Sequence, residues 1–404
     1  MNASSRRWTF ALNTPGFPLL WSATLCSQIG VGMQTVLLGW LVLSMTGSSS
    51  MVGLLFAVRS APNLLVGFVA GALTDRLDRR LLMRLTACSL GLVSWLMAWL
   101  WWMEMLALWQ VLLCAGLFGL CQAFEATARQ AYTVDVVGVG GAVQGLALLF
   151  LAQRLGGVLG SLLAGATLEW GGTGLTCLSM GLSYAGGAAT LWALRQRGSA
   201  APQGQESMWH NVRAYGRELR HNRLMQSLML STAGAELLGF SHQVLLPVLA
   251  KEVLHSGAGG LGLLTAGRFL GGVLGSALLT ALQPTRQRGK LLLAALGLFG
   301  LGLLGLAYVP HFWLALGCVV AINIMAATTD ILHMALLQHS VSNAQRGRAM
   351  GAWVVGIGTA PLGHLEIGYL AGLAGPAMAL ILNGTLLMVL AGVLTLTLPR
   401  LRRL

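Results

Sequence analysis

The chain has few charged residues and few residues of the kinds that build catalytic or metal centres in soluble proteins. Only 9% of its 404 residues are charged, whereas soluble domains contain about 25%. The six cysteines all fall in apolar runs without a C-x-x-C pair, which argues against a disulfide framework or a metal site. Gly289-Lys290 is not followed by Ser or Thr, so no ATP-binding loop is present. We therefore expect no enzyme activity, no cofactor and no bound metal.

Apolar residues dominate instead. They make up 56% of the chain, and the mean hydropathy is +0.73. A membrane-spanning helix needs about 20 apolar residues. Twelve runs meet this length: 18–43, 51–74, 82–102, 106–127, 143–168, 174–194, 225–249, 259–282, 291–309, 312–336, 349–370 and 376–398. The sequence therefore predicts an all-α membrane protein with twelve transmembrane helices in a lipid bilayer. No cleavage site is evident near the N-terminus, so the first span should be retained.

The net charge of +13 follows the expected topology. Almost all basic residues outside the apolar runs lie at the termini or in alternate loops, and the other loops hold only Lys251. Basic loops stay in the cytoplasm, so both termini are predicted to be cytoplasmic. Because topology explains the charge, no nucleic-acid partner is needed.

A long polar segment divides the chain at residues 196–223. It begins with a flexible composition at 198–204 and continues as a basic amphipathic stretch at 209–220. Six apolar runs lie on each side of it. We therefore expect an N-terminal six-helix half (1–195), a cytoplasmic linker (196–223) and a C-terminal six-helix half (224–404).

The loop between the second and third runs reads Gly71-Ala-Leu-Thr-Asp75-Arg76-Leu-Asp-Arg79-Arg80. It resembles the loop between spans two and three of major facilitator superfamily transporters, G-x-x-x-D-R-x-x-R-R. This resemblance implies a fold of two pseudo-symmetric six-helix halves, a small-molecule substrate, alternating access and a monomer. It also implies an inner gate, made of Gly71, Asp75, Arg76, Arg79, Arg80, Arg346 and Arg348.

Further segments are similar to the macrolide and enterobactin exporter branch of the drug:proton antiporters. They are Ala128-Arg129-Gln130-Ala131, Arg346-Gly347-Arg348-Ala349-Met350-Gly351 and Pro361-Leu362-Gly363. The chain departs from the antiporter pattern at Thr127, where proline is usual, and at Leu112 or Leu113, where many antiporters place an arginine. The resemblance implies a proton-driven exporter of a siderophore or drug in a bacterial inner membrane. An importer, a lysophospholipid flippase and a non-transporting sensor or scaffold are the alternatives.

Ionisable residues at membrane depth are costly, and they are functional candidates. Glu236, near the middle of the seventh run, is predicted either to carry the coupled proton or to form a static pair with Arg268. Asp330 is the second candidate for proton coupling, with a helix-end ion pair as its structural alternative. In the resembled fold, spans one, four, seven and ten line the central cavity. The predicted cavity residues are Gln28, Gln34, Gln122, Glu125, Gln243, Asn323 and His333, with Arg154 and Arg268 from spans five and eight.

Arginines at membrane depth bear on the substrate and on gating. If Arg59, Arg154 and Arg268 reach the cavity, they favour an anionic substrate; neutralisation by acidic residues of the chain would remove that preference. Arg59 and Glu366 lie in the outer parts of spans that face each other in the resembled fold. They are predicted to form an outer gate.

One six-residue sequence occurs twice. Residues 156–161 in the fifth run and 271–276 in the eighth both read Gly-Gly-Val-Leu-Gly-Ser. Small residues let membrane helices approach closely. The two copies are predicted to be opposing surfaces where spans five and eight slide on each other.

Overall fold

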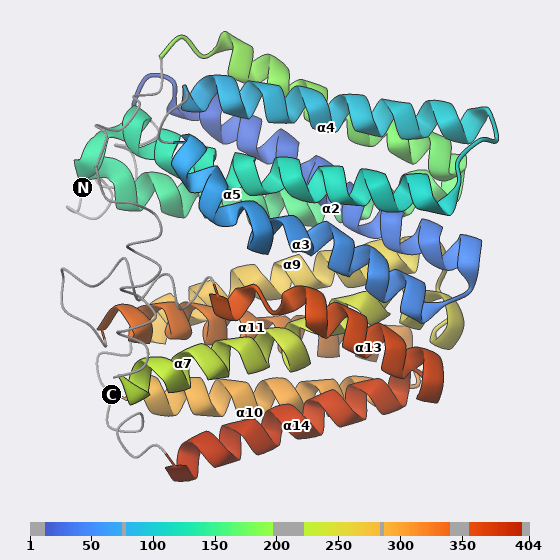
Figure 1. The fold of residues 1–404 in the computed structure, drawn as a ribbon, viewed down its shortest axis with the longest axis vertical. Helices are drawn as coiled ribbons and strands as arrows, with labels where there is room; N and C mark the ends of the chain where they lie inside the picture. The colour runs from blue at the N-terminus through green and yellow to red at the C-terminus, as the bar shows by residue number, and fades with distance from the viewer. Residues whose placement is uncertain (1–12, 75–77, 197–221, 283–286, 340–354, 398–404) are drawn as a thin grey trace. The chain divides into compact units, whose positions relative to one another are not determined.

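A computed structural model describes residues 13–74, 78–196, 222–282, 287–339 and 355–397, and every regular element among them is a helix (Figure 1). The longer helices are α2 (Phe17–Thr46), α3 (Ser49–Thr74), α4 (Arg79–Trp102), α5 (Leu108–Ala193), α7 (Arg223–Gly234), α9 (Gly257–Leu282), α10 (Arg288–Ala307), α11 (Phe312–His339), α13 (Ala360–Ala374) and α14 (Pro376–Thr397). Between α7 and α9 lie a π-helix (Ala235–Gly239), a 3-10 helix (Phe240–Leu245), α8 (Leu246–Val248) and a second π-helix (Leu249–Val253).

Within the described residues, eight helices are long and apolar enough to cross a bilayer. One of them, α5, is broken at Gly138 and Gly172, where φ is 73° and 69°. Positive φ is readily adopted only by glycine, so α5 changes direction at these two points. Each of its three pieces is long enough to span the membrane. The chain is thus a multi-pass helical membrane protein, as the apolar runs predict.

The structure divides into two compact units. Unit 1 comprises residues 1–45, 58–204 and 257–266, and unit 2 comprises residues 46–57, 205–256 and 267–404. The units differ from the predicted halves by two short segments. The first turns of α3 belong to unit 2, and the first turns of α9 belong to unit 1. The predicted linker lies almost entirely outside the described residues.

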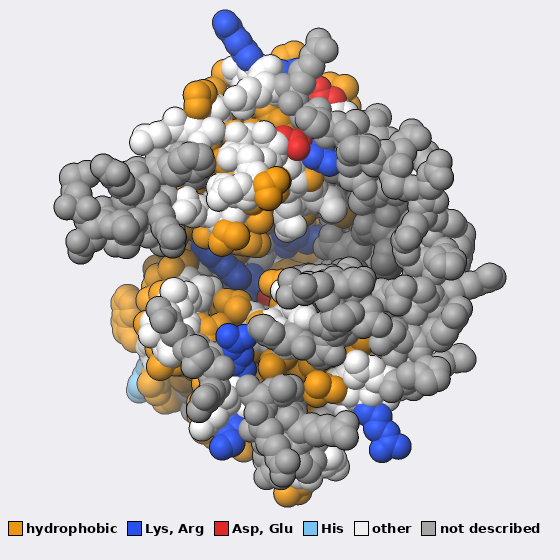
Figure 2. All heavy atoms as spheres, turned by 90° about the vertical axis from the view of Figure 1, so that its left-hand side faces the viewer, with side chains coloured by type: hydrophobic (Ala, Val, Ile, Leu, Met, Phe, Trp, Pro, Cys, Tyr) orange, Lys and Arg blue, Asp and Glu red, His pale blue; other side chains and the backbone are white. Residues whose placement is uncertain are grey.

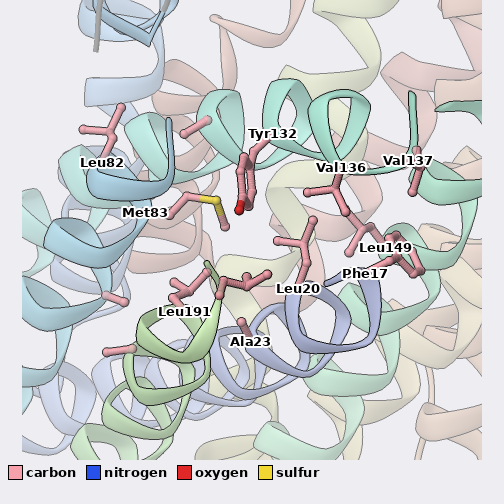
Figure 3. Close-up of a cluster of buried hydrophobic side chains, with 14 residues drawn as sticks. Phe17, Leu20, Ala23, Leu82, Met83, Tyr132, Val136, Val137, Leu149 and Leu191 are labelled. Carbon is pink, nitrogen blue, oxygen red and sulfur yellow. The ribbon is translucent and has the colours of Figure 1, made fainter. Parts of the chain in front are cut away.

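A hydrophobic cluster holds α2, α4 and α5 together in unit 1 (Figure 3). Phe17 and Leu20 of α2, Met83 of α4 and the ring of Tyr132 of α5 belong to this cluster, and all four are almost fully buried. The Tyr132 hydroxyl donates to the backbone carbonyl of Gln196 at 2.8 Å. The apolar ring is therefore packed in the core while its one polar atom is satisfied.

The repeated glycine sequence makes close helix contacts within each unit. Cβ atoms at Gly156 and Gly160 would collide with Gln28 and Ile29 of α2. Cβ atoms at Gly271 and Gly275 would lie 2.5 Å from the carbonyl oxygens of Val320 and Ile324 of α11. Each copy therefore brings its helix close to another helix of its own unit, and the predicted sliding contact between the copies stays a prediction.

Helices α5 and α9 meet within unit 1 at the end of the first copy and after it. A Cβ at Gly262 of α9 would lie 2.9 Å from the Cα of Gly165 in α5 and 2.7 Å from the Ser161 carbonyl oxygen. Glu169 then accepts a hydrogen bond from the backbone N–H of Gly259 at 2.9 Å. That N–H is in the first turn of α9, where backbone donors lack partners within the helix.

Candidate functional site

The helix that carries Glu236 loses regular α geometry at that residue. The π-helix Ala235–Gly239 follows α7 directly and gives way to the 3-10 helix at Phe240. Single-turn π segments inside helices are frequent at functional sites, because they free backbone groups and redirect side chains. The irregular segment thus marks the region around Glu236 as the candidate site of unit 2.

Helix α13 fits closely against this segment. A Cβ at Gly363 would lie 2.6 Å from the carbonyl oxygen and 2.7 Å from the Cα of Leu237. The Thr359 hydroxyl of the preceding turn donates to the Ala233 carbonyl at 3.3 Å. The contact is therefore backbone against backbone, which only a residue without a side chain permits.

Buried polar side chains from three helices converge on residues 231–243. From α11, His333 hydrogen-bonds the Ser231 hydroxyl at 2.7 Å, and Asn323 lies 3.3 Å from Nε2 of His242. From α13, His364 hydrogen-bonds Gln243 at 2.9 Å. The irregular span is therefore the centre of the polar interior of unit 2. These contacts bring the predicted cavity residues Gln243, Asn323 and His333 to one segment.

A second connection runs through α14. Asn383 donates to the carboxylate of Glu366 at 3.1 Å and to the Ser241 hydroxyl at 3.4 Å. Asn383 is fully buried and Glu366 is half-buried. Glu366 is therefore tied to the same irregular span.

Three charged residues gather by the π-helix. Glu236 is half-buried and lies within electrostatic range of both Asp330 of α11 and Arg268 of α9. The three formal charges sum to one negative charge when both carboxylates are ionised. The structure thus brings together the two predicted proton-coupling residues and the predicted partner Arg268.

Unit 1 contains a polar network of its own. Arg59 of α3 donates to the Thr35 hydroxyl at 3.0 Å and to Oε1 of Gln122 at 3.5 Å. Nε2 of Gln122 donates to Oε1 of Gln34 at 2.6 Å, and the Tyr184 hydroxyl donates to the same oxygen at 3.2 Å. The network joins α2, α3 and two pieces of α5, and it contains the predicted cavity residues Gln34 and Gln122.

Glu125 and Arg129, four residues apart on α5, form an ion pair. Nη1 of Arg129 lies 2.9 Å from Oε1 of Glu125, four residues earlier on α5. Both side chains are almost fully buried. We assign this buried ion pair a structural role within α5, because each group already has its counter-ion.

The described arginines after the second span bind within unit 1. Arg79 forms an ion pair with Asp135 of α5. Arg80 donates to the carbonyls of Leu194 and Arg195, and Arg84 donates to carbonyls at residues 191, 192 and 194. The last carbonyls of a helix lack internal partners and attract cations. These arginines therefore hold the end of α5 to the start of α4. Figure 2 shows the face that contains these helix ends, with Lys and Arg side chains scattered among the described residues.

The structure gives little information on the rest of the predicted inner gate. Asp75, Arg76, Arg346 and Arg348 lie outside the described residues, and Gly71 lies in the last turns of α3. For the predicted outer gate, Arg59 and Glu366 belong to different units, and each has the hydrogen-bond partners given above within its own unit. Both gates stay predictions.

The remaining predicted cavity residues lie on helices of unit 1. Gln28 is on α2, where its Cβ packs on Gly156, and Arg154 is half-buried on α5. The sequence interpretation missed Thr35, Asp135, Tyr184, Ser231 and Asn383, although each makes a buried or half-buried polar contact. Tyr184, one of five tyrosines in the chain, and Asn383 are uncommon residue types for the interior of an apolar run, and this signal could have identified them.

Solved structures share this fold. A bacterial homolog of the human lysosomal transporter Spinster matches with a TM-score of 0.71 and 16% identity, over 96% of this chain and 98% of that chain. The nucleoside transporter NupG matches with a TM-score of 0.76 and 13% identity, over 95% and 99% of the two chains. At such identities the likeness concerns the fold alone. The likeness shows that the chain has the major facilitator fold.

Sequence comparison gives the family. Residues 8–403 match the family described as transmembrane secretion effector, so the chain belongs to this family of the major facilitator superfamily. The enterobactin exporter EntS of Citrobacter koseri is 28% identical over 398 residues, which cover 94% of this chain and 92% of that protein. EntS of Shigella boydii is 28% identical over 397 residues, which cover 96% and 93%. The chain is a distant homologue of these exporters over nearly its full length.

Proposed function

We propose that this protein is a proton-coupled exporter of a small amphiphilic compound that moves its substrate by alternating access. The observation that carries the proposal is the grouping of Glu236, Asp330 and Arg268 at the π-helix in unit 2. Two carboxylates and one guanidinium lie together at membrane depth, where ionised groups are costly. Binding of one proton to Glu236 removes one of these charges.

The irregular backbone supports a coupling role. The hydrogen bonding of residues 235–253 changes from π to 3-10 to α and back to π, so this span is less uniform than a continuous α-helix. Side chains of α11, α13 and α14 hydrogen-bond to residues of this span. A change in the charge of Glu236 therefore acts on a span that contacts much of unit 2, which is what coupling protonation to a conformational change requires.

The substrate class rests on two supports. The relatives named above are enterobactin exporters, which favours export of a siderophore or of a drug-like compound. Arginines at membrane depth favour a substrate with an anionic group. We propose a monomer with twelve spans and two six-helix halves in a bacterial inner membrane, with both termini in the cytoplasm and the basic loops on that side.

The test compares small molecules in cells and in medium, with and without the gene, under iron limitation. Export predicts a compound that stays inside cells lacking the gene and appears in the medium of cells that carry it. Cells carrying Glu236→Gln should resemble cells without the gene, whereas Glu252→Gln should behave as the wild type. Glu252 is an exposed acid in the second π-helix of the same span, so it controls for the loss of a carboxylate.

Unchanged metabolite profiles would contradict siderophore export. A drug-susceptibility panel would then test export of drug-like compounds. Uptake would appear as accumulation in cells that carry the gene, and lysophospholipid movement would appear in a lipid-flipping assay. If the drug-susceptibility, uptake and lipid-flipping tests all detect no transport, a sensor or scaffold remains as the function.

A further inference from the structure

We infer that Arg59, with the amides of Gln122 and Gln34, forms the subsite that receives an anionic group of the substrate. This inference rests on the proposed function, because it names the chemical class that the transporter would bind. It uses only contacts within unit 1.

The charge of Arg59 has no carboxylate among its partners in the described part of the chain. Its hydrogen bonds go to the hydroxyl of Thr35 and the amide oxygen of Gln122. Glu125, three residues from Gln122 on α5, is already engaged by Arg129 at 2.9 Å. A guanidinium at membrane depth with neutral partners is costly, and an anionic ligand would remove that cost.

The direction of the hydrogen bonds supports the same conclusion. Arginine can only donate, so it fixes the amide of Gln122 with its oxygen toward Arg59 and its Nε2 toward Gln34. The oxygen of Gln34 then accepts twice, from Gln122 and from Tyr184. Its own Nε2 is buried and has no acceptor among the described residues. The network thus contains a buried donor that is left unsatisfied, which is unfavourable.

A carboxylate, catecholate or other anion supplies the negative charge that is missing among the described partners of Arg59. Its oxygens accept hydrogen bonds, and a planar oxyanion matches the fork of a guanidinium. Arg59 and Gln122 are both partly exposed, whereas Gln34 is fully buried. A ligand would therefore contact Arg59 and Gln122 directly, while Gln34 would act as a positioning residue that fixes the amide of Gln122.

Close helix packing fixes the position of Arg59. The backbone carbonyl of Arg59 approaches so closely to Gly119 that a Cβ there would collide with it. Because Gly119 and Gln122 are three residues apart on α5, they lie on nearly the same face of that helix. Arg59 is consequently held beside Gln122 by backbone contact as well as by side-chain bonds.

The experiment measures binding of 2-naphthoate and of its neutral analogue 2-naphthamide to the full chain in lipid nanodiscs, by equilibrium dialysis at neutral pH. Empty nanodiscs correct for partition into lipid. The wild type should bind naphthoate about tenfold or more tightly than naphthamide, as expected for a charge-assisted hydrogen bond. Arg59→Gln should abolish this ratio, and Arg59→Lys should retain a reduced preference for the anion. Arg195→Gln should match the wild type, because it removes the same charge from an exposed side chain outside the network.

A second variant tests the inference even if Arg59→Gln fails to fold. Gln34→Glu replaces the unsatisfied donor by an acceptor and supplies a counter-ion two hydrogen bonds from Arg59. It should raise the thermal midpoint and remove the preference for naphthoate. The inference is overturned if the wild type binds both compounds equally, or if both Arg59→Gln and Gln34→Glu keep the wild-type ratio. The ratio of the two affinities is measured at equilibrium and without a gradient. A failure of proton-coupled export would therefore leave this ratio unchanged. The anion subsite and the export function can thus be contradicted independently of each other.

Discussion

Arg79 and Asp135 form an ion pair in which one guanidinium nitrogen lies 2.8 Å from Oδ1 and 2.9 Å from Oδ2 of the carboxylate. Only about a tenth of each side chain is exposed. This pair, with Arg80 and Arg84 on the carbonyls that end α5, joins the start of α4 to two places on α5. The second and third basic positions of the loop motif thus have direct structural partners in unit 1.

Removal of one member of this pair should destabilise the protein. Asp135→Ala leaves Arg79 buried without its counter-ion, and breaking a buried pair costs about 3–5 kcal/mol. We expect a clear fall in the thermal midpoint of the detergent-purified protein. Arg79→Ala should have a similar effect, and the double variant should lose less than the sum of the two. Strictly additive losses would show that the two side chains do not interact.

The contact between α13 and the π-helix should tolerate no side chain at Gly363. Gly363→Ala places a Cβ against the backbone of Leu237 and should force α13 away, reducing both the thermal midpoint and export. Gly297→Ala is the matched control, since nothing lies within 4 Å of a Cβ at Gly297 in α10. Because alanine favours a helix over glycine by about 1 kcal/mol, Gly297→Ala should be neutral or stabilising. Equal effects of the two substitutions would contradict the close packing at Leu237.

His333 should act through structure and not as a proton carrier. It is 1% exposed and hydrogen-bonds Ser231 at 2.7 Å. Ser231→Ala leaves the imidazole with an unsatisfied nitrogen, at a cost of about 1–3 kcal/mol, so the thermal midpoint should fall. The pH profile of export should keep its shape in Ser231→Ala and in His333→Asn, even where the amount of active protein is lower. A shifted profile in both variants would assign the histidine a role in coupling.

The sequence predicted the helices well because hydrophobic length and the positions of loops determine them. Apolar runs such as 18–43 and 376–398 match α2 and α14 closely, and the four-residue spacing of Glu125 and Arg129 suits the ion pair that they form on α5. Helical periodicity relates only residues that are near each other in the chain, which is why such pairs can be predicted.

Contacts between distant segments were not predictable in the same way. The partner of Arg79 proved to be Asp135, 56 residues away, and the repeated glycines turned out to face α2 and α11. Both results depend on how the helices are rotated about their axes, and a composition pattern does not record that rotation. The π-helix at Glu236 was not predictable either, because residues 235–238 contain no proline and no glycine pair that would indicate it.

The most direct test of the central claim is transport of the exported compound into everted membrane vesicles that are energised by a pH gradient. The wild type and Glu252→Gln should accumulate the compound against its concentration gradient, and dissipation of the pH gradient should abolish this. Glu236→Gln should no longer respond to the pH gradient while still exchanging labelled for unlabelled compound, because the permanently neutral side chain removes only the proton-dependent step. Gradient-driven accumulation by Glu236→Gln at the wild-type rate would contradict the assignment of proton coupling to Glu236.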